Sequence, residues 1–78
     1  MPIIHVNNEN FKEVIEKNDV VILDFYANWC GPCRMLAQVL EEISETNPNL
    51  VIGKINVDEE GELAQAFSIR SIPQLYIS

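Results

Sequence analysis

The sequence predicts an α/β protein whose central sheet is covered by helices on both faces. Residues 20–26 are apolar and rich in β-branched side chains apart from one carboxylate, and residues 50–57 form a second apolar run. Between these runs, apolar residues recur at helical spacing from residue 35 to residue 43. Strands that are apolar on both faces are typical of parallel sheets buried between helices. The strand, helix and strand therefore predict a parallel unit with a right-handed crossover.

The composition predicts one ordinary globular domain. The chain has 78 residues, 47% apolar and 22% charged, so we expect a single domain over residues 1–78 with a small core. Twelve acidic residues against five basic ones give a formal charge of −7, which repels nucleic acids and anionic membranes. No apolar run approaches the roughly 20 residues that span a bilayer, and we see no signal-peptide pattern. We therefore expect a cytoplasmic protein that binds neither nucleic acid nor membrane.

The N-terminal part of the sequence predicts a short strand followed by a short helix. Residues 3–6 predict the strand, and Asn7-Asn8 provides an N-cap for the helix. The apolar face of this helix repeats at spacings of three and four, and Asn18-Asp19 ends the pattern.

The C-terminal part is punctuated by turns. Asn47-Pro48-Asn49 ends the long helix near residue 46, and the acidic residues 58–60 begin a short helix, where negative charge favours the positive helix end. Residues 68–73 then predict a loop, and residues 74–78 the beginning of a last strand.

The only two cysteines, Cys30 and Cys33, stand where the long strand is followed by the helix. Helix positions i and i+3 share a face, so the two thiols can form a bridge if their Cα atoms lie within about 7 Å. At a helix N-terminus the free N–H groups and the macrodipole favour a Cys30 thiolate. Pro32 needs no N–H in this turn, and Gly31 allows a partner's backbone to approach. The pattern predicts one reversible disulfide, with Cys30 as nucleophile and Cys33 as resolving thiol.

Two other interpretations of the cysteines stay open at this point: a buried inert pair and half of a zinc or iron–sulfur site. Zinc takes about four ligands, and only His5 and scattered carboxylates are available to complete Cys30 and Cys33. A C-x-x-C pair beside a strand–helix–strand pattern is typical of redox proteins. We therefore expect no metal site and no cofactor besides the redox-active disulfide.

Asp24 is a carboxylate within an apolar strand, where burial costs several kcal/mol unless the group is paired or protonated. It is either a buried acid with a raised pKa that accepts the Cys33 proton through water, or a strand-end aspartate bonded to backbone or solvent. Lys54, on the neighbouring strand, either pairs with this carboxylate or extends to solvent.

Two further positions are ambiguous from the residues alone. Trp29, next to Cys30, either contacts a partner or covers the core. The Ile72-Pro73 bond is either an ordinary trans bond or one of the roughly 5–6% of X-Pro bonds that are cis.

Taken together, these residues resemble the thioredoxin family over essentially the whole chain. Trp29-Cys30-Gly31-Pro32-Cys33 matches the family's active-site motif, residues 21–26 resemble its central strand with the buried aspartate at Asp24, and residues 69–73 resemble its cis-proline loop. The resemblance implies a thioredoxin-like three-layer sandwich with a mixed sheet. The implied strand order is residues 3–6, 50–57, 20–26 and 74–78.

The resemblance also implies the activity, that of a protein disulfide reductase acting in redox homeostasis. It implies Cys30 as the exposed nucleophile, Cys33 as the resolving thiol and Asp24 as the proton-transfer group assisted by Lys54. The implied partners are protein disulfides and a thioredoxin reductase that carries its own NADPH and flavin. It implies that Pro73 is a cis-proline packed against the disulfide. It also implies an apolar surface that receives substrate protein, formed by Trp29, Gly31, Pro32, Ile72 and Pro73.

Members of the family continue through a hairpin, a further strand and a final helix beyond the point where this sequence stops. We therefore expect a sheet that is incomplete at its C-terminal edge, with residues 74–78 as an exposed strand that favours self-association. Two rival functions remain: a redox-inactive binding or assembly module, and a dimer bridged by metal through Cys30 and Cys33.

Overall fold

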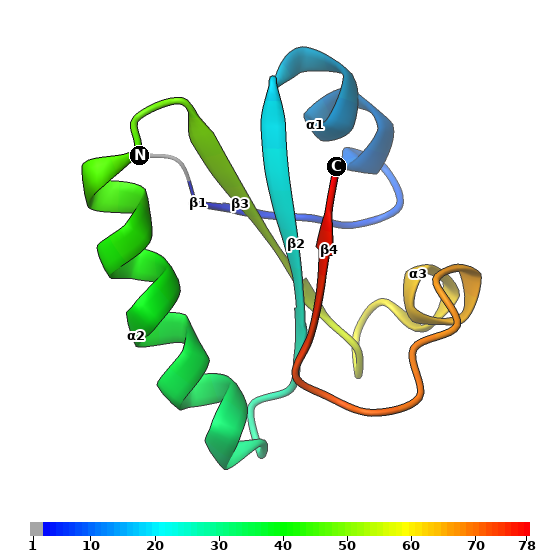
Figure 1. Ribbon diagram of the computed structural model, residues 1–78. Helices are drawn as coiled ribbons and strands as arrows, with labels where there is room; N and C mark the ends of the chain where they lie inside the picture. Colours follow the sequence, from blue (N-terminus) through cyan, green and yellow to red (C-terminus); the bar gives the residue numbers. More distant parts are fainter. Residues whose placement is uncertain (1–2) are drawn as a thin grey trace.

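A computed structural model describes residues 3–78, which form one four-stranded sheet and three helices (Figure 1). The sheet order is β1-β3-β2-β4, with β1, β3 and β2 parallel and β4 antiparallel to β2. The predicted fold class and strand order are confirmed. None of the helices within residues 3–78 is long and apolar enough to cross a bilayer. The elements are β1 (Ile3–His5), α1 (Phe11–Lys17), β2 (Val20–Tyr26), α2 (Gly31–Thr46), β3 (Leu50–Asn56), α3 (Gly61–Ala66) and β4 (Gln74–Ile77).

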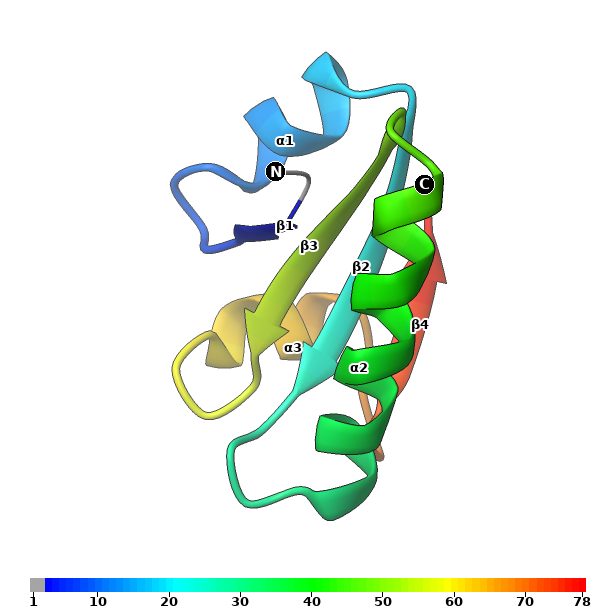
Figure 2. The ribbon, with the colours of Figure 1, turned by 90° about the vertical axis from the view of Figure 1, so that its left-hand side faces the viewer.

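The helices cover the two faces of the sheet unequally: α2 lies on one face, and α1 and α3 lie on the other (Figures 1 and 2). At the centre, β2 and β3 pair over seven residues, from Val20 opposite Leu50 to Tyr26 opposite Asn56. Because these strands are parallel, they end at the same edge of the sheet, where α/β proteins place their functional sites. The loop that carries the cysteines leaves this edge.

The main core lies between the sheet and the helices α1 and α3. Val21, Leu23 and Phe25 alternate along β2, and each has at most 1% of its surface exposed. Phe25 contacts Phe67 and Tyr76, with ring centroids 5.2 and 6.0 Å apart. Side chains alternate between the faces of a strand, so Asp24 points the other way, toward α2.

The first helix begins later than the predicted cap. Its N-cap is Asn10, whose side chain makes no capping bond, rather than Asn7 or Asn8. The Asn7 side-chain oxygen instead accepts hydrogen bonds from the backbone N–H groups of Glu9 and Asn10, and the Asn10 side-chain oxygen accepts from the N–H of Asn7. Short polar side chains compete with helical hydrogen bonding in this way, and here they form a closed turn before α1.

The outer strand β4 is exposed at all four of its residues. Leu75 lies opposite Asp24 in the β2–β4 register, so it and Ile77 face the side of the sheet that α2 covers. Met35 and Val39 of α2 are exposed as well. Within residues 3–78, the expected exposed strand is therefore present.

Gly53 is required by the close packing between β1, β2 and β3. A Cβ atom at this position would lie 2.9 Å from a methyl carbon of Val6 and 3.1 Å from one of Leu23. We expect Gly53→Ala to lower the free energy of unfolding by about 1–3 kcal/mol, the usual cost of overpacking a core. Urea unfolding followed by circular dichroism measures the change.

Gly61→Ala is the matched control, because a Cβ atom there meets nothing within 4 Å. This exposed substitution at the start of α3 should leave stability unchanged or slightly higher. Equal stabilities of the two variants would contradict the packing described for Gly53.

Candidate active site

The junction between β2 and α2 places Cys30 at the N-cap of α2. Its backbone is extended (φ −91°, ψ 107°), and the backbone N–H of Cys33 donates to Cys30 Sγ at 3.2 Å. Pro32 occupies the first helical turn, where the N–H it lacks has no helical acceptor. The free end of the helix is thus directed at the Cys30 sulfur, where its N–H groups and dipole stabilise a thiolate.

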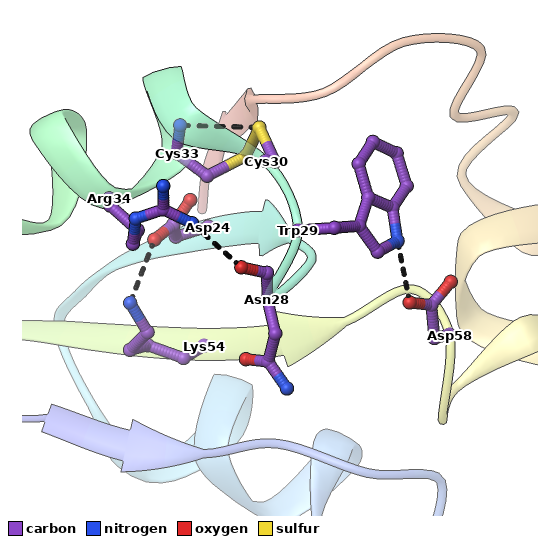
Figure 3. Close-up of a disulfide and its surroundings, with 8 residues drawn as sticks. All are labelled: Asp24, Asn28, Trp29, Cys30, Cys33, Arg34, Lys54 and Asp58. Carbon is purple, nitrogen blue, oxygen red and sulfur yellow. Dashed lines mark hydrogen bonds and ion pairs between the residues drawn. A yellow bond between two sulfur atoms is a disulfide. The ribbon is translucent and has the colours of Figure 1, made fainter.

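Cys30 and Cys33 form a disulfide with their Cα atoms 5.3 Å apart (Figure 3). The predicted pairing is therefore present. Both residues are largely buried, with 5% of the surface of Cys30 and 2% of Cys33 exposed, so Cys30 is the more accessible. Ala27 is buried in the same cluster, and Ile72 packs against it.

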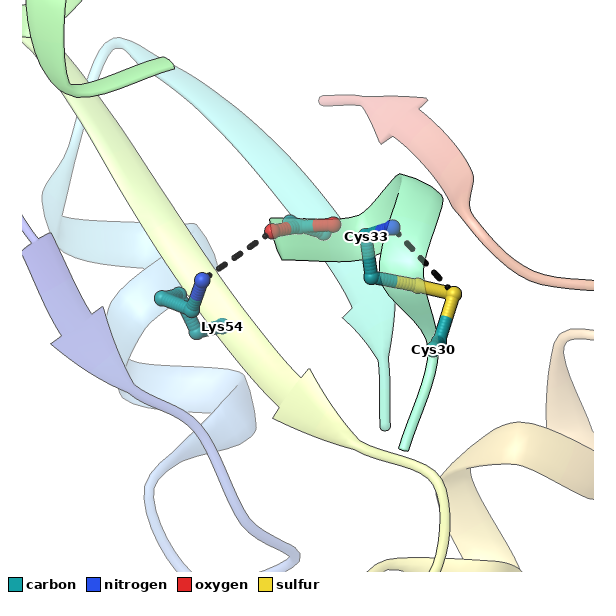
Figure 4. Close-up of polar contacts among 4 residues, drawn as sticks. Cys30, Cys33 and Lys54 are labelled. Carbon is teal, nitrogen blue, oxygen red and sulfur yellow. Dashed lines mark hydrogen bonds and ion pairs between the residues drawn. A yellow bond between two sulfur atoms is a disulfide. The ribbon is translucent and has the colours of Figure 1, made fainter. Parts of the chain in front are cut away.

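Asp24 is completely buried and faces Lys54 across the β2–β3 ladder. The Lys54 ammonium lies 3.3 Å from Asp24 Oδ2 (Figure 3), and Oδ1 has no hydrogen-bond partner among the described residues. Figure 4 draws Lys54 together with Cys30 and Cys33. Burial raises the pKa of Asp24, and the Lys54 charge and hydrogen bond oppose this effect without cancelling it. Lys54 is also held 4.5 Å from the centre of the Tyr26 ring. The structure thus favours the buried, paired interpretation of both side chains.

A cavity of about 130 Å³ separates Cys33 from Lys54. Tyr26, Arg34 and Ala37 also line it. This volume accommodates several water molecules, because each occupies about 30 Å³ in the liquid. The cavity therefore connects the resolving cysteine with Lys54, which is in contact with the buried Asp24.

Trp29 is 69% exposed, so it does not cover the core. Its indole N–H donates to Asp58 Oδ2 at 2.9 Å (Figure 3), and the Asp58 backbone N–H donates to the side chain of Asn56 at 2.9 Å. Sequence reasoning missed this contact and treated Asp58 only as an acidic residue near a helix start. The turn after β3 therefore positions the aromatic side chain next to Cys30.

Arg34 fixes the loop before Cys30 from the other side. Its Nη1 donates to the backbone oxygen of Asn28 at 2.9 Å. The sequence analysis assigned no role to Arg34, and a side chain one residue after the second cysteine carries no signal of this contact.

The loop before β4 reaches the same site. The Ile72-Pro73 peptide bond is cis, as the family resemblance implies. Ile72 and Pro73 are half-buried, Gly31 is half-buried, and Pro32 is exposed. The structure thus brings Ile72 to the cysteines from about forty residues further along the chain.

The metal interpretation gains no support from the described side chains. Among residues 3–78, no three His, Cys, Asp or Glu side chains gather where they could hold a metal ion. His5 lines a separate cavity with Asn56, Glu59 and Glu60.

Comparison with known proteins decides the family. A family model described as Thioredoxin matches residues 2–78. The chain belongs to the thioredoxin family. "Putative thioredoxin 2" from Streptomyces coelicolor is 46% identical over 74 residues, and a thioredoxin from Chlamydia pneumoniae is 43% identical over 72 residues. These matches cover 95% and 92% of this chain. The resemblance seen in the residues is confirmed.

Solved structures of the family share its fold. A point mutant of a thioredoxin from Halobacterium salinarum superposes with a TM-score of 0.89 at 41% identity, covering 96% of this chain and 66% of that one. Oxidised mitochondrial thioredoxin 3 from Saccharomyces cerevisiae gives a TM-score of 0.91 at 31% identity, covering 97% and 73%. The chain spans 55% of the Streptomyces relative and 70% of the Chlamydia relative.

The raised pKa of Asp24 predicts how stability depends on pH. Below the ordinary carboxyl pKa of 3.8, Asp24 is protonated in both the folded and the unfolded state, so its ionisation does not lower the free energy of unfolding. As pH rises above 3.8, the unfolded chain loses this proton first, so the folded state is destabilised until pH exceeds the folded pKa. We expect Asp24→Asn to unfold at higher urea concentration than the wild type at pH 7, with the difference shrinking toward about pH 4.

Asp19→Asn is the control, because Asp19 is exposed and the substitution removes the same charge. It should change stability by no more than about 0.5 kcal/mol. A less stable Asp24→Asn variant at pH 7 would show that pairing with Lys54 outweighs burial.

Proposed function

We propose that the chain is a protein disulfide reductase that acts by dithiol–disulfide exchange. The observation that carries this proposal is the Cys30–Cys33 disulfide at the start of α2, with the Cys33 N–H directed at Cys30 Sγ in a member of the thioredoxin family. A sulfur in this position is activated as a thiolate, and its partner is already within bonding reach.

In the first step, the Cys30 thiolate of the reduced protein attacks one sulfur of a substrate disulfide. A bond forms between Cys30 and that sulfur, and the second substrate sulfur leaves as a thiolate and takes up a proton. Cys30 is the attacking residue because it is the more exposed cysteine and receives the helix N–H.

In the second step, Cys33 resolves the mixed disulfide. Its thiol gives a proton to the Asp24 carboxylate, relayed by water in the cavity that Cys33 and Lys54 line, and the resulting thiolate attacks Cys30 Sγ. The Cys30–Cys33 bond forms, the remaining substrate sulfur leaves as a thiolate, and the substrate is reduced by two electrons. Lys54 has a positioning role, because it binds Asp24 and borders the cavity.

The remaining partners follow from this chemistry. The exchange needs no cofactor besides the disulfide itself, but the oxidised protein must be returned to the dithiol by another reductant, for which we propose a thioredoxin reductase. A reducing compartment, the cytoplasm, suits both partners. Trp29, Gly31, Pro32, Ile72 and Pro73 are the proposed substrate-contacting residues.

Insulin reduction with dithiothreitol as the electron source tests the proposal. Cys30→Ser and Cys33→Ser should both fall to the uncatalysed rate, because each lacks one of the two sulfurs that the exchange uses. When pre-reduced Cys33→Ser is mixed with insulin after dithiothreitol has been removed, it should retain a covalent mixed disulfide with substrate through Cys30, detectable by mass spectrometry. Ala66→Ser, an exposed serine substitution on α3, should keep wild-type turnover. A wild-type protein without turnover would favour the binding-module alternative.

The same assay tests Asp24. In Asp24→Asn, resolution of the mixed disulfide should slow at neutral pH by up to about 100-fold, within the usual range for a general base. The deficit should shrink as pH approaches about 8.5, where a thiol ionises unaided. A pH-independent deficit would indicate a structural role instead.

We also propose that two copies of the chain associate through β4. Its outer edge has no strand partner among residues 3–78, and the apolar side chain of Ile77 on this strand is 75% exposed. Sedimentation should show self-association at high micromolar concentration that Ile77→Lys weakens. Gln65→Lys adds the same charge on α3 and should leave association unchanged. A compact wild-type monomer throughout would refute the proposal.

A further inference from the structure

An apolar groove of about 320 Å³ begins beside Trp29 and continues toward the loop before β4. Two of its lining residues, Val57 and Ile72, also pack against the cluster that contains the disulfide. The groove is therefore continuous with the reactive site. Its apolar lining consists of Trp29, Val57, Ala64, Ile69 and Ile72.

Arg70 is the one charged side chain among the described residues that line this groove. It is exposed, and within residues 3–78 it forms no ion pair. The other cations near the site are already engaged, because Lys54 binds Asp24 and Arg34 binds the backbone oxygen of Asn28. The guanidinium of Arg70 is thus available to an incoming group.

The groove includes Trp29 and Ile72 of the proposed substrate surface. We propose that Arg70 makes this part of the surface select substrate segments with Asp or Glu beside their disulfide. The inference rests on the proposed reductase function and specifies its substrates. An apolar substrate side chain fits the lining, and a carboxylate matches the planar donors of a guanidinium. Asp58, in the loop after β3, is already bonded to the indole of Trp29.

The net charge of −7 repels an acidic substrate at long range, whereas Arg70 would attract its carboxylate only in direct contact. At physiological ionic strength charges are screened beyond about 8 Å, whereas a contact pair is affected less. An exposed ion pair of this kind strengthens binding about two- to fivefold. Arg70 does not touch the reacting sulfurs, so the effect belongs to substrate binding rather than to the rate of exchange.

Synthetic peptides test this selectivity. Each peptide carries one cysteine as a mixed disulfide with pyridine-2-thiol and one Glu at a different position beside it, with Gln in its matched partner. Pre-reduced protein is mixed with excess peptide, and release of pyridine-2-thione gives the half-saturating concentration and the limiting rate. For at least one position, the half-saturating concentration should be about two- to fivefold lower with Glu, and about 0.5 M salt should reduce this ratio.

Substitutions at Arg70 test whether this residue causes the difference in half-saturating concentration between Glu and Gln peptides. Arg70→Gln should bring the ratio between Glu and Gln peptides to about one, and Arg70→Glu should reverse it, so that the Gln peptide has the lower half-saturating concentration. Lys12→Gln removes an equal charge from α1, outside the groove, and should keep the wild-type ratio. Equal half-saturation by Glu and Gln peptides at every position, or a ratio that survives in Arg70→Gln, would overturn the proposal.

Failure of the reductase function has a separate signature: the neutral Gln peptides would release no thione from the wild-type protein. In that case, peptides with Ser in place of Cys are titrated into the oxidised protein, and the NMR signal of the Trp29 indole is followed. Tighter binding of the Glu peptide, lost in Arg70→Gln, would support the groove assignment without turnover. Equal binding would refute it.

Discussion

The in-register parallel pairing of β2 with β3 is the constraint on which the site depends. It sets Asp24 opposite Lys54, so a completely buried carboxylate has an ammonium 3.3 Å away. A shift of one residue would turn Asp24 into the aromatic core on the other face. The same pairing ends both strands at one edge of the sheet. The loops that follow can therefore meet, and Trp29 bonds to Asp58 there.

Burial and pairing act on Asp24 in opposite directions, and burial prevails. Lys54 reaches only Oδ2, while Oδ1 has no partner among the described residues. The pKa of Asp24 is consequently raised, although an ammonium is in contact with it. A better-solvated carboxylate would stabilise the fold more but would bind a proton less readily. In the proposed mechanism this reduced stability accompanies a proton-accepting group, which is a common compromise at functional sites.

Sequence patterns predict the helices and strands well where the spacing of apolar residues defines them. The same patterns miss contacts between loops. The strand over residues 20–26 and the helix that follows the cysteines have nearly the bounds expected from the sequence, because apolar runs and helical spacing are local signals. The Trp29–Asp58 and Arg34–Asn28 bonds depend on how the chain folds back, so no local pattern marks them. The family resemblance supplied the strand order, which the residues alone left undetermined.

In the proposed function, disulfide chemistry and substrate selection depend on different parts of this chain. Cys30 and Cys33 lie within one strand–helix junction, and the geometry of that junction is set by local features such as the N-cap and Pro32. The groove beside them is formed mainly by residues 57–72, which follow β3 and precede β4. Substitutions in this second region can change which disulfides bind without altering the two sulfurs or their helix. Proteins that share the cysteine motif can therefore differ in substrate, and in our proposal Arg70 is the residue that distinguishes between substrates of this chain.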